Sequence, residues 1–208
     1  MRIKSYLLFV GVFLLSSLFR PLALAADSPV IIILGDSISA AYNMETGQSW
    51  PSLLQERLSR SGYSHRVFNS SITGDTTQGG LSRLPRLLEK YHPALVIIEL
   101  GGNDGLRGIP IDITRANLST MIESSQAAGA TVLLAEMRIP PNYGMTYTEQ
   151  FNGSYGLLKE KYDVLLIPFL LEHVALEPGL MQADGIHPNA EAQPVLLDTV
   201  WAALEPEL

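Results

Sequence analysis

Short, largely apolar segments alternate along the chain with segments in which apolar residues recur every three or four positions. The short segments cover residues 30–34, 66–69, 94–100, 131–135 and 164–167, and the first is a row of branched apolar residues. Segments of this length are typical of buried strands, because an ordinary helix needs about ten residues or more. We therefore predict five strands, the first of which ends at a turn beginning at Gly35.

Helices are predicted between and after these strands. Trp50 and Pro51 are typical of a first helical turn, and Thr114 and Asn189 are suited to cap two later helices. Helical periodicity also covers residues 81–91 and 147–161. Apolar strands that alternate with helices are typical of a parallel sheet covered on both faces. We predict an α/β protein, a three-layer α/β/α sandwich with a five-stranded parallel sheet and right-handed crossovers.

The carboxyl ends of parallel strands share one edge of the sheet, so the loops that follow them converge there. The loops concerned cover residues 35–39, 70–80, 101–105 and 136–147. Ligands of open α/β sheets bind outside this edge. We therefore look for candidate chemistry in these loops.

The first 25 residues differ in character from the rest. Basic residues are followed by a short apolar run, and Ala23 and Ala25 form an Ala-x-Ala ending. This order is typical of a secretory signal peptide cleaved after Ala25. A membrane anchor is the alternative, but the apolar run is shorter than the roughly 20 residues that span a bilayer.

We therefore predict a signal peptide at residues 1–25 and one domain at residues 26–208. The whole chain has 208 residues, 47% of them hydrophobic and 17% charged, which suits a single globular domain. The protein is expected to be periplasmic or secreted, with no stable membrane anchor after cleavage.

Charge and cysteine content exclude several partners. The formal charge is −7, and the loss of Arg2, Lys4 and Arg20 with the signal peptide makes it −10. An acidic surface repels nucleic acid and anionic membrane surfaces, so neither is expected as a partner. The sequence has no cysteine, which excludes a thiolate zinc site, and it lacks the His-x-x-x-His and His-Glu-x-x-His motifs. No metal or other cofactor is expected.

Ser37, directly after the first strand, is a candidate nucleophile. For a Gly-Asp-Ser tripeptide alone, a turn serine or a helix N-cap is the favoured interpretation, because Ser and Asp are common in turns. A nucleophilic serine needs a base, a group that orients the base, and donors for the oxyanion. His187 is the candidate base, because Asp184 stands three residues before it in the same loop. The remaining histidines are expected in surface or packing roles: His65, His92 and His173.

Gly74 and Asn103 are the candidate oxyanion donors, together with the backbone N–H of Ser37. A loop glycine brings its N–H close to a substrate, and an asparagine offers a side-chain amide. An ordinary loop glycine and an Asx turn are the alternatives. The loop carboxylates Asp36, Asp75 and Asp104 leave a paired-carboxylate hydrolase open, although we favour bracing roles for them. The sequence has no Gly-x-Ser-x-Gly elbow, Gly-x-Gly-x-x-Gly motif or P-loop.

Taken together, these motifs resemble the SGNH (GDSL-type) hydrolase family. The matching blocks are residues 35–39 (Gly-Asp-Ser-Ile-Ser), 71–77, 101–104 (Gly-Gly-Asn-Asp) and 184–188 (Asp-Gly-Ile-His-Pro). Residues 138–144 and 181–184 are most similar to the small exported bacterial thioesterase, lysophospholipase and arylesterase type. One departure is Ile38, where the motif usually has leucine, a volume-conserving change.

The resemblance implies a flavodoxin-like fold, a Ser37–His187–Asp184 triad, and an oxyanion hole formed by Ser37, Gly74 and Asn103. It implies a cofactor-independent monomer that hydrolyses small acyl esters and thioesters through an acyl-enzyme on Ser37. The acyl chain is expected along residues 75–81, 106–111 and 139–147, with Ile139 and Tyr143 as substrate-binding residues. A carbohydrate O-deacetylase and a catalytically silent binding protein are the alternative functions.

Overall fold

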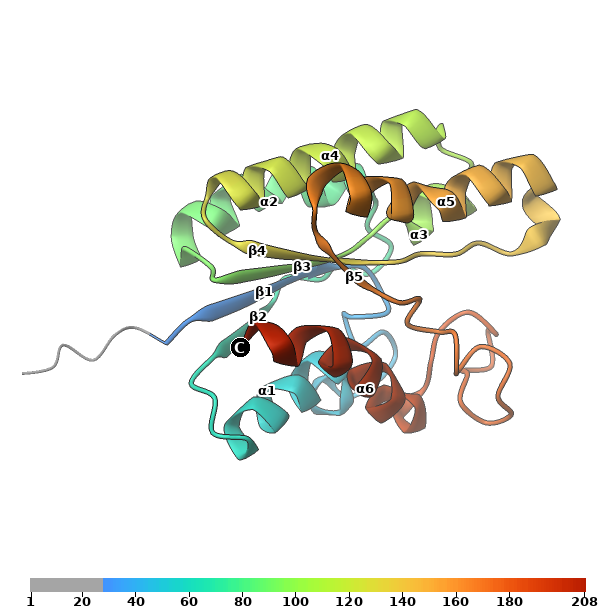
Figure 1. The fold of residues 1–208 in the computed structure, drawn as a ribbon. Helices are drawn as coiled ribbons and strands as arrows, with labels where there is room; N and C mark the ends of the chain where they lie inside the picture. Colours follow the sequence, from blue (N-terminus) through green and yellow to red (C-terminus); the bar gives the residue numbers. More distant parts are fainter. Residues whose placement is uncertain (1–27) are drawn as a thin grey trace, which may run out of the picture.

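A computed structural model describes residues 28–208, so the expected signal peptide lies outside the described residues. Five strands form one parallel sheet: β1 (Val30–Gly35), β2 (Arg66–Asn69), β3 (Leu95–Glu99), β4 (Thr131–Ala135) and β5 (Leu165–Ile167). The strand order is β2-β1-β3-β4-β5 (Figure 1). Each strand lies within one residue of its predicted bounds, and the five-stranded parallel sheet is confirmed.

Helices cover both faces of the sheet. They are α1 (Trp50–Arg60), α2 (Thr77–Tyr91), α3 (Gly102–Leu106), α4 (Ile111–Ala127), α5 (Met145–Tyr162) and α6 (Gln193–Leu204). Figure 1 shows α2, α4 and α5 on one side of the sheet and α1 and α6 on the other. The predicted three-layer α/β/α sandwich is therefore confirmed.

The strand β1 shows why the apolar runs are continuous. Ile32 and Leu34 pack into the core shared with α2, α4 and α5, whereas Ile31 and Ile33 pack into the core shared with α1 and α6. Successive side chains of a strand point to opposite faces, so a strand with helices on both faces needs apolar residues throughout. Each such fully buried side chain stabilises the fold by about 1.5–3 kcal/mol.

The strand order creates a crevice at the carboxyl ends of β1 and β3. The chain passes from β1 to β2 on one side and from β3 to β4 on the other, so the loops after β1 and β3 diverge. A switch point of this kind is where ligands bind in open α/β folds. Ser37 follows β1 and Asn103 follows β3, which places both at this crevice.

The helices α2 and α4 begin earlier than predicted, and the structure contains a short helix, α3, that was not predicted. The helix α2 begins at Thr77 rather than after residue 80, and α4 begins at Ile111, so Thr114 is not a cap. Asp104, in the unpredicted helix α3, explains the early start of α2, whereas α4 begins directly after Pro110. One carboxylate oxygen of Asp104 accepts the Thr77 N–H (2.9 Å), and the other accepts the hydroxyl groups of Thr77 and Thr114. A carboxylate distant in the sequence thus caps α2.

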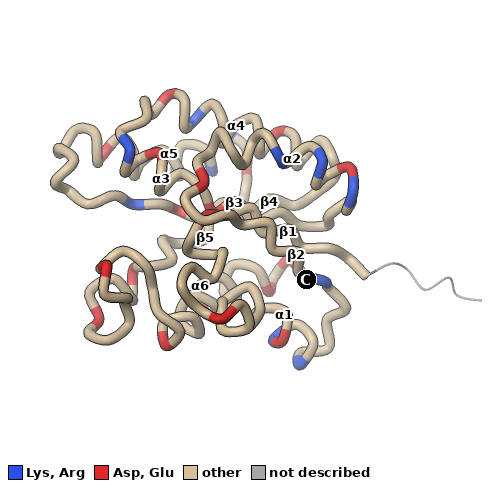
Figure 2. Tube along the Cα trace, turned by 180° about the vertical axis from the view of Figure 1, so that it is seen from behind, with Lys and Arg blue, Asp and Glu red and all other residues tan. Residues whose placement is uncertain are grey.

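Most basic residues lie over the layer of α2, α4 and α5, whereas α6 and the coil before it carry acidic residues and no lysine or arginine (Figure 2). In the part of the chain that the structure describes, no helix is both long and apolar enough to cross a membrane.

The buried network around Asp104 generates a stability prediction. Asp104→Ala leaves the N–H and O–H of Thr77 without their acceptor and should lower the free energy of unfolding by about 2–4 kcal/mol. Urea unfolding of the wild type and the variant measures this loss. Asp112→Ala is the control: it removes an exposed carboxylate from the first turn of α4 and should lower the free energy of unfolding by less than about 1 kcal/mol. Equal losses in the two variants would contradict the role of Asp104.

Candidate active site

Ser37 lies in a tight turn directly after β1. The carbonyl of Asp36 accepts the N–H of Ala40 (3.0 Å), and the Asp36 carboxylate accepts the N–H of Ile38 (3.0 Å). These two bonds hold the residues on either side of Ser37. The serine is therefore presented at the crevice by a braced turn and not by a helix N-terminus.

A second tight turn presents Asp184 and His187. Met181 and Pro188 form an isolated antiparallel bridge, and the N–H of Gln182 donates to the carbonyl of His187 (2.8 Å). Gly185, at the tip of this turn, has a φ of +67°, a left-handed conformation that favours glycine. The Asp-x-x-His spacing therefore brings both side chains to the same side of one turn.

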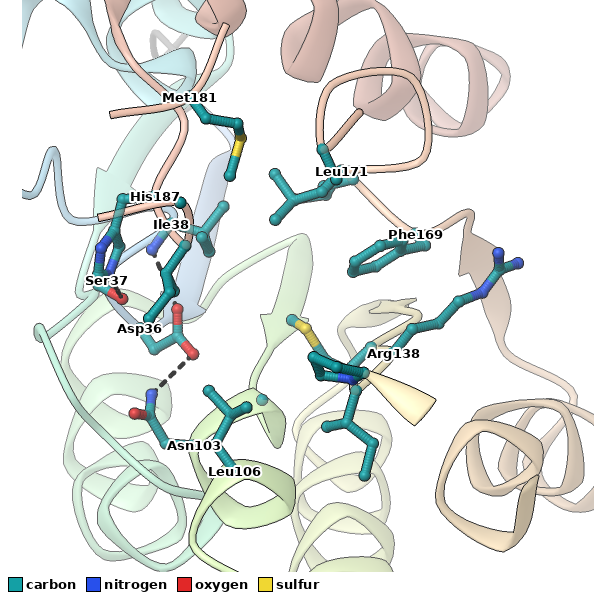
Figure 3. A pocket seen from close by; sticks show the side chains of 18 of the residues that line it. Asp36, Ser37, Ile38, Asn103, Leu106, Arg138, Phe169, Leu171, Met181 and His187 are labelled. Atoms are coloured by element: carbon teal, nitrogen blue, oxygen red, sulfur yellow. Dashed lines mark hydrogen bonds between the residues drawn. The ribbon is translucent and has the colours of Figure 1, made fainter. Parts of the chain in front are cut away.

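The two turns place three side chains in a hydrogen-bonded chain. Ser37 Oγ lies 2.9 Å from His187 Nε2, and His187 Nδ1 lies 2.7 Å from Asp184 Oδ2. Figure 3 shows Ser37 and His187 side by side at one end of a cavity. This geometry permits proton transfer from the serine to the imidazole while the carboxylate orients the ring.

The Asp184 carboxylate is held in its ionised form. Its Oδ1 accepts the backbone N–H groups of His187 (3.0 Å) and Ile186 (2.9 Å). These hydrogen bonds and the one from the His187 ring lower the pKa of Asp184 to about 2. An ionised Asp184 accepts from Nδ1 and so leaves Nε2 free to accept the Ser37 proton.

Tyr42 and Gln182 join the two turns. The Tyr42 ring packs on the His187 ring, with the ring centroids 4.2 Å apart. The Gln182 amide donates to the carbonyls of Tyr42 and Pro188, each at 3.0 Å. The imidazole is therefore supported by packing as well as by Asp184.

The backbone N–H groups of Ser37 and Gly74 are free to bind a ligand. Within residues 28–208, neither donates to a protein acceptor. Gly74 has a φ of +77°, which favours glycine, and its carbonyl accepts from the Arg107 guanidinium (2.8 Å). Arg107 follows α3, the helix that contains Asn103. The loop after β2 is thus tied to the loop after β3.

The Asn103 side chain has a partner that sequence reasoning did not predict. One of its amide hydrogens is donated to Asp36 Oδ2 (3.0 Å). An NH₂ group has two donors, so the second stays available to an oxyanion. Figure 3 shows this bond between the amide and the carboxylate below the serine turn. Asp36 therefore orients the candidate donor and, like Asp75 and Asp104, has a bracing role.

A cavity of about 520 Å³ opens beside Ser37 and His187. Leu106 and Ile139 line it, as expected from the sequence, and Ile139 is only 5% exposed. Tyr143 lies outside the lining, in a 3₁₀ turn before α5, and is 39% exposed. The structure brings Ile139 to the site but not Tyr143.

Sequence reasoning missed two parts of this cavity. The coil after β5 supplies much of the apolar wall: Phe169, Leu170, Leu171, Ala175 and Leu176. The apolar residues of this segment do not recur with the period of a helix or a strand. Their clustering in a coil is the one sequence feature that could have indicated a cavity wall. Glu99 lines the cavity floor, and its signal is a lone carboxyl in the apolar run 94–100. The expected contribution of residues 75–81 is absent from the lining.

Comparisons with known proteins agree with this geometry. Residues 33–194 match the model of the GDSL-like Lipase/Acylhydrolase family. The chain is 51% identical to Esterase TesA of Pseudomonas aeruginosa, over 88% of this chain and 91% of that protein. It is 45% identical to Thioesterase 1/protease 1/lysophospholipase L1 of Escherichia coli, over 88% and 86% of the two chains. The crystal structure of the psychrotrophic esterase EstA from Pseudoalteromonas, inhibited by monoethylphosphonate, is similar with a TM-score of 0.83, at 40% identity over 86% and 98% of the chains.

The hydrogen-bonded chain predicts how Ser37 reacts. A fluorophosphonate should label wild-type protein stoichiometrically and should not label Ser37→Ala. The labelling rate should be lower in acid than at neutral pH, because a protonated imidazole cannot accept the serine proton. Asp184, with its pKa of about 2, stays ionised well below neutral pH and does not cause this fall. Asp184→Asn should slow labelling by about 10³–10⁴-fold.

Mass spectrometry of the intact protein over time measures this labelling. His173→Ala, which changes an exposed histidine outside the cavity, serves as the control and should react at the wild-type rate. A folded wild-type sample that does not react, or a rate that is constant from acid to neutral pH, would contradict a serine activated by a histidine.

Proposed function

Because this chain belongs to the GDSL-like Lipase/Acylhydrolase family, we propose that it is a serine hydrolase that cleaves acyl esters and thioesters at Ser37. The observation that carries this proposal is the Ser37–His187–Asp184 hydrogen-bonded chain at the mouth of an apolar cavity. The names of the relatives, an esterase and a thioesterase/lysophospholipase, support the same class of substrate.

In the first half of the proposed reaction, His187 accepts the Ser37 proton while Ser37 Oγ attacks the acyl carbonyl carbon. The carbonyl oxygen becomes an oxyanion that accepts from the N–H groups of Ser37 and Gly74 and from the Asn103 amide. His187 then donates its proton to the leaving alcohol or thiol, and the acyl group stays on Ser37. In enzymes that stabilise an oxyanion in this way, removal of one donor typically lowers kcat by about 10²–10³-fold.

In the second half, water repeats the attack. His187 removes a proton from the water as it adds to the acyl-enzyme, and returns that proton to Ser37 Oγ as the carboxylic acid leaves. Ser37 supplies the nucleophile and His187 carries the proton in both halves of the reaction. The proposed mechanism therefore needs no cofactor and no second subunit. The phosphonate-inhibited relative supports a nucleophilic serine of this kind.

The cavity favours an acyl chain over a sugar. Apart from Arg138, its wall beyond the serine is formed by aliphatic and aromatic side chains, among them Phe169, Leu171 and Met181 (Figure 3). Each methylene buried there contributes about 0.8 kcal/mol to binding. Acyl esters and thioesters with a long apolar chain therefore suit the site better than acetylated carbohydrates, the substrates of an O-deacetylase.

We also propose that residues 1–25 direct export to the periplasm or the medium and are removed. The support is the basic, apolar and Ala-x-Ala order of this segment. Expression of the full chain in a Gram-negative host, followed by cell fractionation and N-terminal sequencing, should recover a periplasmic or secreted protein that begins at Ala26. A protein that keeps its first residues in the cytoplasm would contradict export.

A substrate panel tests the proposed function. Acyl-CoA, lysophospholipid and aryl esters should all be hydrolysed by the wild type and not by Ser37→Ala. Activity confined to acetylated sugars would favour the O-deacetylase, and no hydrolysis by folded protein would favour a binding protein.

The cavity predicts the acyl-chain preference. Ile139→Ala should lower the ratio of kcat/KM for p-nitrophenyl laurate over p-nitrophenyl acetate by roughly 10-fold, because apolar contact with the longer chain is lost. Leu157→Ala removes an exposed apolar side chain from α5 and should leave the ratio unchanged. If the ratio is the same in Ile139→Ala and the wild type, the acyl chain does not lie in this cavity.

A further inference from the structure

Glu99 is a fully buried carboxyl that the proposed mechanism leaves without a role. It is the last residue of β3, pairs in register with Gly35 of β1, and is 0% exposed. Its Oε2 accepts the N–H of Asp36 (3.1 Å) and the O–H of Ser39 (2.6 Å). These two donors lie on either side of Ser37. Glu99 thus holds the nucleophile turn from beneath.

Glu99 and Asp36 place two buried carboxyls together without a cation. Asp36 is 4% exposed, and within the described chain neither residue forms an ion pair with lysine or arginine. Two adjacent anions removed from water repel each other and lose their hydration, so at least one of them holds a proton.

The hydrogen bonds indicate which carboxyl holds the proton. Both oxygens of Asp36 accept N–H groups, from Ile38 and from the Asn103 amide, and these bonds favour the ionised form. Glu99 Oε1 has no hydrogen-bond partner among the described residues. Burial, followed by the Asp36 charge, raises the pKa of Glu99 well above its ordinary value. The proton therefore belongs on Glu99.

The other ionisable groups around this pair do not alter the assignment. Arg83 of α2 donates to the Gly35 carbonyl (3.3 Å), but its ion pair is with Asp75. His187 acts on Asp36, and the buried Tyr155 hydroxyl of α5 lies within the field of both carboxyls. Of these two groups, only the His187 imidazole can carry a positive charge.

We propose that Glu99 is a positioning residue that acts in its neutral, protonated form: it holds the turn from Asp36 to Ser39 and, through Asp36, the Asn103 amide. The inference rests on the proposed function, because it assigns these groups to ester hydrolysis. A neutral Glu99 supports the oxyanion donors without adding a second negative charge behind the oxyanion. An ionised Glu99 would oppose the charge that develops there.

The central experiment compares Glu99→Gln with Glu99→Leu. A glutamine resembles a protonated glutamate, because its carbonyl can accept from Asp36 and Ser39, so kcat should stay within about 3-fold of the wild type. A leucine fills the space without an acceptor, so kcat should fall by about 10–100-fold while KM changes little, because the loss concerns the transition state. Glu149→Gln, at an exposed position on α5, is the control and should leave both constants unchanged.

The protonation state is read separately by ¹³C NMR of protein labelled at the glutamate side-chain carboxyl. The Glu99 signal, assigned by its absence in Glu99→Gln, should lie at the carboxylic-acid position at pH 7. A signal at the carboxylate position, or a loss of kcat in Glu99→Gln as large as that in Glu99→Leu, would overturn the inference. Full activity in Glu99→Leu would overturn it as well.

Two further measurements keep the test decisive. If Glu99→Leu does not fold, Ser39→Ala removes one of the two donors and should lower kcat with little change in KM; an unchanged kcat would contradict the positioning role. Wild-type and Ser37→Ala protein are assayed alongside. If the wild type does not hydrolyse esters, the proposed function fails, whereas the NMR signal still reports whether Glu99 is neutral.

Discussion

The pairing of β1 with β3 is the constraint on which the rest of the site depends. It places Gly35 beside Glu99 in register and makes the following loops diverge, so that Ser37 and Asn103 face one crevice. The pairing also leaves no room at Gly35: a Cβ atom there would lie 2.5 Å from Glu99 Oε2 and 2.8 Å from Ser71 Oγ. The glycine of the first motif is therefore required by a close approach between neighbouring strands. The nucleophile turn therefore begins at a position where a larger residue would collide with Glu99 and Ser71, which limits the movement of Ser37.

Two carboxyl groups near Ser37 show how the surrounding structure determines whether a side chain is ionised. Asp184 sits in an exposed turn and accepts hydrogen bonds at both oxygens, so its pKa is lowered to about 2 and it stays charged beside the histidine. Glu99 is sealed beneath the opposite side of Ser37, where burial raises its pKa. Side chains with the same functional group thus differ in charge because Asp184 is solvated and accepts hydrogen bonds at both oxygens, whereas Glu99 is fully buried beside a second carboxylate. The site needs this difference: an anion orients the base, while a neutral acceptor supports the turn below the oxyanion.

Much of the fold was predictable because burial on both faces of a parallel sheet demands apolar residues along its central strands. The strands follow such runs within one residue. Helix starts were less predictable. The start of α2 depends on Asp104, a carboxylate from a short helix after β3, and capping from a distant residue leaves no local signal at Thr77. The same holds for the cavity wall after β5, since a coil that becomes apolar lining carries no helix or strand period.

Periodicity and the motifs at the ends of strands were enough to predict the strands, the layers and the identity of the side chains that converge near Ser37. The hydrogen-bond partners of those side chains became visible only in the folded chain. Asp36 contacts both Glu99 and Asn103, residues more than 60 positions away, and neither contact is encoded in local spacing. Such contacts depend on strand order and register, which bring distant segments within hydrogen-bonding distance. For the same reason, the sequence predicted a serine at a turn, and only the fold shows how Ser37 is held.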